Sequence, residues 1–302
     1  MTQDSQAATG SLMRERLDVQ VRRLKEFWGF YRVSRIGMLG LLIIIAFIIM
    51  AIVAPMIAPY DPRALVGTPF LTPTGGHLLG TDQVGRDIYS QLIWGSRVSL
   101  MVGLLASAFG VAIGTAIGLV SGYFRGPPDS ILMRVTDLFI TLPGLPLMLI
   151  LAALLGRSMW NIIFVISVTG WTGTAKMVRS QTLSIKERPY IEAARSVGAK
   201  DGHIIMRHIL PNIFPLVFAN AIVGIVDAIL AESGLSFLGL GDPTKPSWGQ
   251  LLRYANEAGA LATGRWWFII PPGLCIMLVA IGFAFSSYSL DQILNPRLRK
   301  RR

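Results

Sequence analysis

Long apolar runs dominate this sequence and leave few folds open to it. A helix needs about 20 apolar residues to cross the hydrocarbon core of a bilayer, and six runs approach or exceed that length. Because no water reaches that depth, each run must satisfy its own backbone hydrogen bonds, as a helix does. The sequence therefore predicts an all-α polytopic membrane protein with six transmembrane helices. The predicted spans cover residues 36–58, 98–122, 131–155, 160–180, 213–238 and 266–289.

The net charge of +11 is distributed in a way that indicates orientation in a membrane rather than nucleic-acid binding. Of the 28 lysines and arginines, 21 fall in alternate segments between the spans, namely 1–35, 121–134, 176–212 and 291–302. Basic residues accumulate on the cytoplasmic side of membrane proteins. We therefore expect a multi-pass protein of the cell (plasma or inner) membrane, with both termini cytoplasmic, the lipid bilayer as a partner and no nucleic-acid partner.

The segments around the spans suggest a division into regions. Residues 12–35 carry apolar side chains at steps of three and four between arginines, which is typical of a helix lying in the membrane interface. The long segment 59–97 is rich in proline and glycine and is expected to form a structured cap outside the membrane. The predicted regions are an N-terminal interfacial helix 1–35, a first span 36–58, an outer loop 59–97, the remaining spans 98–290 with a cytoplasmic loop 184–212, and a basic tail 291–302.

Glycines at every fourth position mark one face of the second span. Such a stripe lets another helix backbone approach closely, either within the chain or in another subunit. The residues are Gly110, Gly114, Gly118 and Gly122.

Ionisable side chains inside spans cost roughly 2.5–3.5 kcal/mol on insertion scales, so each calls for an explanation. Asp137 follows Arg134 by three residues, and we expect these two to pair on one helical face. Asp227 and Glu232 in the fifth span have no such local partner. They are candidates for a watery pathway, with contact to another helix as the alternative.

Signatures of catalysis are missing from the sequence. No lysine is followed by serine or threonine, so there is no phosphate-binding loop of the Walker A type. The histidines lack the spacing of a helical zinc pair, and no serine sits in a G-x-S-x-G turn. We expect no catalytic residue, no metal site and no bound cofactor, so any energy must come from an ion gradient or another protein.

The stretch "YIEAARSVGAKDGHIIMRHILPN", residues 190–212, lies between two spans and predicts a helix–turn–helix elbow in the cytoplasm. Pro189 suits the first turn of a helix and Gly198 its end. Asp201 is expected to cap a second short helix, which Pro211 ends before the fifth span.

The tip of this elbow carries small side chains that would let a partner surface come close. By physics alone it is a docking element for a cytoplasmic partner, and the alternative is a solvated elbow with no partner. The tip residues are Ala193, Ala194, Ser196, Gly198 and Ala199.

The segment "EAARSVGAKDGHIIMRHILP" resembles the EAA loop of ABC-importer permeases, and its "RHILPN" ending resembles the dipeptide/oligopeptide/nickel branch of that family. His208 stands where the general pattern has an aliphatic residue. The segments "HLLGTDQVGRDIYSQLIWGSRVSL", "MRVTDLFITLP" and "ESGLSFLGLG" are similar to the first outer loop and the third and fifth spans of that branch. The resemblance runs from about residue 25 to 298.

This resemblance implies a five-helix type I importer core with one added peripheral helix, the first span. It implies a cytoplasmic coupling helix that contacts a separate ATPase, carried by Glu192, Ala193, Ala194, Gly198 and Ala199. The implied partners are a homologous second permease, two ATP-binding subunits that use ATP and Mg, and an extracytoplasmic solute-binding protein. Candidates for contact with that binding protein are Asp82, Gly85, Arg86, Asp87 and Trp248.

The resemblance therefore implies a transport subunit, not an enzyme, that passes di- or oligopeptides into the cytoplasm. Nickel or an oligosaccharide is the alternative cargo for the same class of importer. An ion-driven secondary transporter would need acidic residues matched between inverted halves, and Asp227 and Glu232 have no evident counterparts. A membrane scaffold whose elbow only recruits a partner is the remaining alternative.

Overall fold

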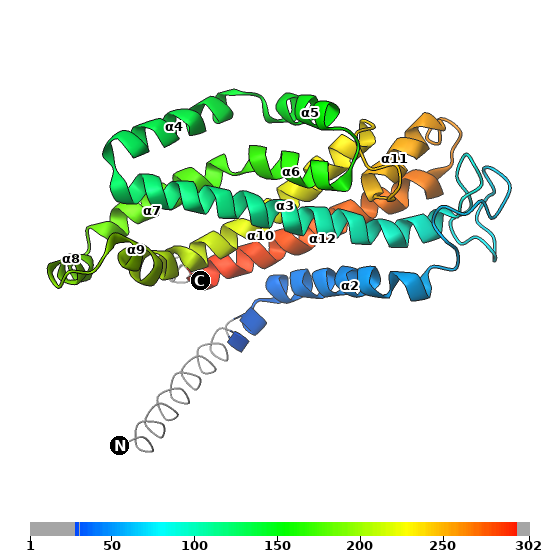
Figure 1. Ribbon diagram of the computed structural model, residues 1–302. Helices are drawn as coiled ribbons and strands as arrows, with labels where there is room; N and C mark the ends of the chain where they lie inside the picture. Colours follow the sequence, from blue (N-terminus) through cyan, green and yellow to red (C-terminus); the bar gives the residue numbers. More distant parts are fainter. Residues whose placement is uncertain (1–27, 30, 295–302) are drawn as a thin grey trace, which may run out of the picture.

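The computed structural model describes residues 28, 29 and 31–294, which form a bundle of helices (Figure 1). The interfacial helix predicted for 1–35 lies largely outside the described residues, and so does most of the tail 291–302. Within the described part, extended pairing is limited to isolated bridges joining Leu65 to Arg86 and Thr81 to Asp87, so the all-α prediction is confirmed there. The elements are α2 (Arg35–Ile57), α3 (Ile88–Phe124), α4 (Gly126–Thr141), α5 (Gly144–Leu155), α6 (Met159–Gly170), α7 (Thr172–Lys186), α8 (Pro189–Ser196), α9 (Asp201–Ile204), the π-helical segment η1 (Ile205–Ile209), α10 (Leu210–Phe237), α11 (Trp248–Glu257) and α12 (Trp266–Leu294).

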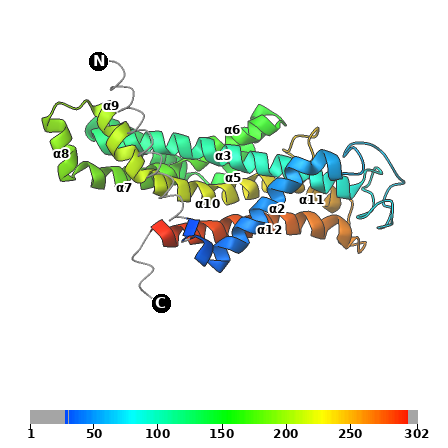
Figure 2. The ribbon, with the colours of Figure 1, turned by 90° about the horizontal axis from the view of Figure 1, so that it is seen from below.

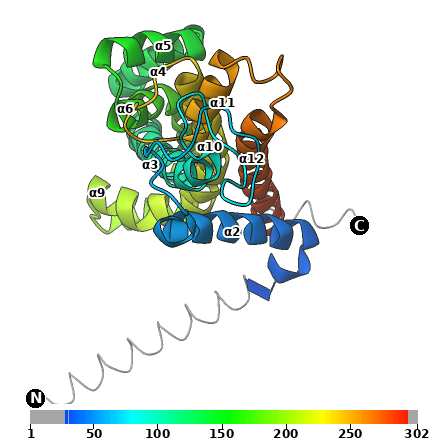
Figure 3. The same cartoon turned by 90° about the vertical axis from the view of Figure 1, so that its right-hand side faces the viewer.

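Helix α3 runs through the middle of the bundle. It packs against α2, α4, α6, α7 and α10, while α12 packs against α2, α10 and α11. Seen end on, α3 and α10 are central, with α4, α5 and α6 to one side, α12 to another and α2 across a third (Figure 3). The α8–α9 elbow lies at one end of the helices, and the loop before α3 lies with α11 at the opposite end (Figures 1 and 2).

Helices long and apolar enough to cross a membrane number four in the described part: α2, α3, the stretch Asp201–Phe237 and most of α12. The predicted span 131–155 is not one continuous helix, because α4 and α5 meet at a bend of 93°. Leu142 at the break has an extended backbone with ψ of 132°, since the ring of Pro143 disfavours the helical conformation for the residue before it. Counting this pair as one broken span gives five candidates rather than six.

Two further helices differ in extent from the predicted spans. Helix α3 begins at Ile88 rather than at residue 98, because the carboxylate of Asp87 accepts a hydrogen bond from the Ser90 N–H and starts the helix before its apolar part. The predicted span 160–180 is divided at Trp171. Its first part, α6, is apolar but only 12 residues long, and its second part, α7, continues to Lys186.

The glycine stripe on α3 packs against α6 and α7 of the same chain. A Cβ atom on Gly114 would lie 2.5 Å from the carbonyl oxygen of Trp171, and one on Gly118 would lie 2.6 Å from that of Ala175. Only glycine permits backbones to approach this closely. Of the two alternatives for the stripe, packing within the chain is the one observed.

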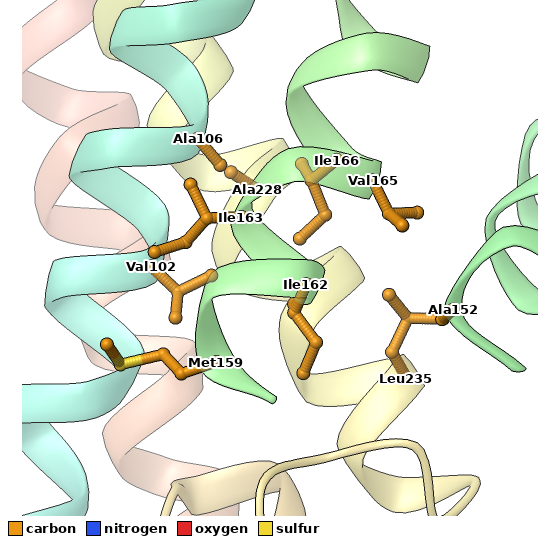
Figure 4. Packing of buried hydrophobic residues seen from close by; sticks show 10 residues of the cluster. All are labelled: Val102, Ala106, Ala152, Met159, Ile162, Ile163, Val165, Ile166, Ala228 and Leu235. Carbon is orange, nitrogen blue, oxygen red and sulfur yellow. The ribbon is translucent and has the colours of Figure 1, made fainter. Parts of the chain in front are cut away.

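The largest apolar cluster joins α3, α5, α6 and α10 on the side of α3 opposite α2 and α12 (Figures 3 and 4). Its members are close-packed aliphatic side chains, which fix the spacing of these helices. They are Val102, Ala106, Ala152, Met159, Ile162, Ile163, Val165, Ile166, Ala228 and Leu235.

Candidate functional site

The elbow between α7 and α10 starts with the short helix α8. It begins at Pro189, as predicted, and ends before Gly198, whose φ is +82°. The N–H groups of Gly198 and Ala199 donate to the carbonyls of Arg195 at 2.9 Å and Ala194 at 3.0 Å. These two bonds form a Schellman motif, which places its glycine at positive φ. The backbone turn therefore requires glycine at this position.

The predicted coupling residues lie together on the tip of the elbow. Ile191 of α8 is fully buried against the bundle, so the rest of the helix is held outward. The apolar side chain of Val197 is 85% exposed beside the small residues. Glu192, Ala193 and Gly198 are exposed, and Ala194 and Ala199 are half-buried.

Tyr123, near the end of α3, fastens the elbow to the bundle. Its hydroxyl donates to the carboxylate of Asp201, and Arg195 donates to the same hydroxyl at 3.4 Å. The charged groups of Lys186 and Arg195 lie 5.2 and 5.6 Å from the centre of its ring, at cation–π distance. Lys186 also donates to the Tyr123 carbonyl. One residue of α3 thus holds the end of α7, α8 and α9.

The surroundings of Tyr123 are strongly basic. Burial lowers the pKa of Lys186, and the cations of Arg125 and Arg195 lower it further. Arg125 forms an ion pair with Glu187 at 2.6 Å, but both side chains are more than half exposed, so this pair contributes little. The buried contacts of Tyr123 therefore matter more for the position of the elbow than the exposed ion pair between Arg125 and Glu187.

The second half of the elbow differs from the prediction. Asp201 begins α9, but Lys200 occupies the cap position and the Asp201 carboxylate binds Tyr123 instead. Pro211 does not end a helix, because α9 passes through η1 into α10 as one stretch. The Leu210 N–H donates to the Ile205 carbonyl, and this wider π turn accommodates the proline, which has no N–H. The elbow is thus joined to α10 without a loop.

At the opposite end of the bundle, Asp82 organises the loop before α3. One carboxylate oxygen accepts from the N–H groups of Val84 and Arg86, both at 2.9 Å. The other accepts from the Gln91 side chain at 3.1 Å. The Asp82 side chain is fully buried, and its carboxylate holds the loop in place.

Asp87 and Gly85 are also used within the loop. Asp87 accepts from the N–H and hydroxyl of Ser90, each at 2.7 Å, and lies 2.9 Å from Nδ1 of His77. Gly85 has φ of +92°, and a Cβ atom there would lie 2.2 Å from the Gly67 carbonyl oxygen. Both residues shape the loop rather than its surface.

Trp248 is fully buried and donates from its ring nitrogen to the Leu92 carbonyl at 3.0 Å. Of the five residues predicted to contact a binding protein, only Arg86 is partly exposed. Direct contact stays a prediction for Arg86. For the other four, the buried positions support an indirect role in shaping the outer surface.

Glu232 is buried and does not line the cavity described below. It is 1% exposed and accepts from the hydroxyl of Ser99 on α3 at 3.2 Å and from Ser236 at 2.7 Å. The Trp248 N–H in turn donates to Ser99 at 3.3 Å. Of the two alternatives for Glu232, contact with another helix is observed, because its carboxylate binds Ser99 of α3, which in turn binds α11.

Asp227, by contrast, is exposed and lines a cavity of about 190 Å³ between α3, α5, α6, α7 and α10. The ion pair predicted between Asp137 and Arg134 is wrong. Asp137 of α4 pairs with Lys176 of α7 at 2.8 Å instead of with Arg134. Asp227 therefore remains the predicted pathway residue that the structure places at an open space.

Sequence reasoning missed Tyr123 and Val197. The signal for Tyr123 was its position directly after the last glycine of the stripe, where an aromatic ring beside basic residues indicates a cation–π contact. Val197 was detectable as an apolar residue in an otherwise small or charged tip. Its exposure makes it part of the surface that the tip of the elbow presents.

The apolar spans, the open cavity between them and the projecting elbow define an integral membrane transport subunit. Residues 114–300 match the family model described as binding-protein-dependent transport system inner membrane component, and residues 23–74 match the N-terminal TM domain of oligopeptide transport permease C. The chain belongs to this binding-protein-dependent family and is the permease subunit of an ABC importer, not an enzyme. Importers of this kind work with ATPase subunits and a solute-binding protein.

Individual relatives cover nearly the whole chain. It is 35% identical over 279 residues to the dipeptide transport system permease protein DppC of Bacillus subtilis, covering 91% of this chain and 86% of the relative. It is 34% identical to the oligopeptide transport system permease protein OppC of the same organism, with 89% and 88% covered. It is 34% identical to the glutathione transport system permease protein GsiD of Pectobacterium atrosepticum, with 91% of each covered.

A similar fold occurs in a solved structure of the MetNI methionine ABC transporter in inward facing conformations. The TM-score is 0.53 at 19% identity, with 70% of this chain and 97% of that chain covered. This likeness shows the fold of an ABC transporter subunit over the part that it covers.

Proposed function

We propose that this chain passes di- or oligopeptides from an extracytoplasmic binding protein into the cytoplasm, with α8 as its coupling helix. The observation that supports a peptide cargo is the similarity, over nearly the whole chain, to permeases named for dipeptide, oligopeptide and glutathione transport. Glutathione is itself a tripeptide, so these names share one chemical class.

The proposed assembly is a homologous second permease, two ATP-binding subunits and one binding protein. ATP and Mg are bound by the ATPase subunits, and this chain binds no cofactor. Spans from α3 onward form the type I core, and α2 is the added peripheral helix. Both termini and the elbow are cytoplasmic, as the basic residues of 1–35, 176–212 and 291–302 favour.

In this assembly, ATP binding draws the two ATPases together and moves the elbow seated on each of them. The small residues of the tip, with Glu192 at its edge, allow close seating, and Val197 supplies an apolar anchor that is 85% exposed in this chain. Because the elbow is joined to α10 without a loop and held to α3 by Tyr123, its displacement tilts both helices. The pathway then opens outward, receives the solute, and closes again after hydrolysis.

Nickel is a weaker candidate cargo on the residues of the cavity. Nickel sites favour imidazole ligands, and the cavity lining includes neither histidine nor cysteine. An oligosaccharide is uncharged and would leave the carboxylate of Asp227 without a counter-ion.

Transport is tested with the complete complex reconstituted in vesicles with labelled trialanine. We expect ATP-dependent accumulation that requires the binding protein. Vesicles containing ATPase subunits with an inactivated ATP site are the matched control. Accumulation of nickel or a labelled oligosaccharide but not of trialanine would overturn the peptide assignment.

The coupling role is tested by crosslinking from the elbow. Cys275 is the only cysteine in the sequence, so Ala193→Cys in a Cys275→Ser background places a single reactive thiol on the tip. We expect crosslinks to the ATPase subunit in intact membranes. Leu261→Cys, at an 83% exposed site near the opposite end of the bundle, is the control and should capture no ATPase. Capture from both sites or from neither would contradict the coupling role.

A further inference from the structure

The cavity beside Asp227 lies at the edge of the main apolar cluster, roughly midway along α10. Ala106 and Ala228 belong both to that cluster and to the cavity lining, and they lie next to each other between α3 and α10 (Figure 4). A single water needs about 10–15 Å³ of such space, and the cavity offers about 190 Å³. It therefore has room for part of a solute.

The carboxylate of Asp227 has neither a hydrogen bond nor an ion pair with any residue in the part of the chain described. Its side chain is exposed, although it stands on a largely apolar helix of 28 residues. A charged side chain within a membrane-spanning helix is costly and is compensated by water, a ligand or an opposite charge. By comparison, Asp137 in α4 has Lys176 as its partner at 2.8 Å.

Neutral hydrogen-bonding groups lie on the same face of α10. Asn220 precedes Asp227 by seven residues, or two helical turns, so both are on one side about 10.5 Å apart along the axis. The Asn220 amide donates to the hydroxyl oxygen of Thr174 at 2.8 Å. This bond leaves the side-chain carbonyl oxygen of Asn220 and the hydroxyl hydrogen of Thr174 available to a solute. Gly224 lies between Asn220 and Asp227 and has no side chain to fill this part of the cavity.

The spacing and chemistry match one end of a short peptide. An extended peptide advances about 3.3–3.6 Å per residue, so three residues span the distance from Asp227 to Asn220. Every unmodified peptide has an α-ammonium group and backbone amides, whatever its side chains. A carboxylate with an amide and a hydroxyl two turns away can recognise these shared groups without selecting a sequence.

We propose that this cavity is a subsite for the amino-terminal end of a peptide in transit. The Asp227 carboxylate pairs with the α-ammonium group, and Asn220 and Thr174 hydrogen-bond the backbone amides that follow. The subsite rests on the proposed function, since it assumes a peptide cargo. A contact between Asp227 and a basic residue of the second permease is the competing explanation.

Binding is tested on the assembled permease–ATPase complex without the binding protein, so that the selectivity of that protein does not enter. Trialanine is expected to raise the melting temperature of the wild-type complex, and N-acetyl-trialanine, which lacks the ammonium group, is not. Asp227→Asn should abolish the shift with trialanine. Asp137→Asn, which removes a carboxylate outside the cavity, is the matched control and should keep it.

Transport supplies the second measurement. With the binding protein present, Asp227→Asn should lower trialanine uptake about tenfold, as expected for the loss of a charge-assisted hydrogen bond. Asp227→Glu should restore most of it. ATP hydrolysis stimulated by the loaded binding protein should change little in either variant.

Three outcomes would overturn the subsite. A trialanine shift that persists in Asp227→Asn would show that the carboxylate is not used in binding. A ligand-free complex of Asp227→Asn that melts earlier and hydrolyses less ATP, with Asp227→Glu giving no rescue, would assign Asp227 to the permease interface. Absence of trialanine uptake by the wild-type complex would remove the peptide function itself, which the first two outcomes leave intact.

Discussion

At the scale of single residues, Tyr123 of α3 ties the elbow to the bundle. The hydroxyl binds Asp201 and Arg195, and the ring faces Lys186 and Arg195. Hydrogen bonds to charged groups contribute about 1.5–3 kcal/mol. Tyr123→Phe keeps the ring and its cation–π contacts but loses the bond to Asp201. We expect fewer peptides transported per ATP hydrolysed, because the elbow then moves without drawing α3 along.

The measurement is the ratio of trialanine uptake to ATP hydrolysis in vesicles. Tyr89→Phe is the matched control, since Tyr89 lies near the other end of α3 and its hydroxyl makes no hydrogen bond to the described residues. An unchanged ratio in Tyr123→Phe would show that the hydroxyl of Tyr123 plays no part in coupling.

Gly198 tests backbone conformation separately from contact. Its φ of +82° is strained for other residues, and a Cβ atom there would meet nothing within 4 Å in this chain. Positive φ costs a non-glycine residue about 1–3 kcal/mol, least for asparagine and most for a β-branched residue. We expect Gly198→Val to block uptake while Gly198→Asn keeps most of it, measured at equal membrane levels. Equal loss in both variants would mean that any side chain clashes with the partner.

At the scale of helices, the α3–α7 contact is sensitive to a single methyl group. In Gly114→Ala the new Cβ would lie 2.5 Å from the Trp171 carbonyl oxygen and 2.7 Å from Cβ of Thr174. Overpacking of this kind costs about 1–3 kcal/mol, so the purified complex should melt at a lower temperature. Gly234→Ala in α10 is the control, because its Cβ would meet nothing within 4 Å. Equal melting temperatures would contradict the tight packing of these helices.

The helices themselves were largely predictable, because apolar length and glycine spacing act locally. The bend between α4 and α5 also had a local signal in Pro143, but hydropathy alone gives one continuous apolar run across it. The continuity of α9, η1 and α10 was not predictable from Pro211, since the π turn that accommodates it depends on the packing of Ile204 and Ile209 in the core. Local rules fail where tertiary contacts select the conformation.

At the scale of the whole molecule, the sequence indicated which segments carry function better than what each residue does there. Asp227 and Glu232 were indistinguishable as acidic residues in one span, yet five positions on a helix place them on different faces. One carboxylate is enclosed by hydroxyl groups from α3 and from its own helix, and the other faces an open cavity. Such differences depend on residues far away in the sequence, which a pattern along one segment does not contain.

The separation of the elbow and the outer loop to opposite ends of the helices leads to a test of orientation (Figure 1). Because the elbow belongs to the alternate segments of the sequence that hold 21 of the 28 basic residues, its end of the bundle should face the cytoplasm. In a Cys275→Ser background, a membrane-impermeant maleimide should modify Leu261→Cys in intact cells. It should modify Ala193→Cys only after the membrane is permeabilised, because that thiol lies behind the bilayer. Both sites are exposed in the chain, so full modification of each after permeabilisation and denaturation of the complex is the control. The reverse pattern in intact cells would place the elbow outside, where no ATPase could drive it.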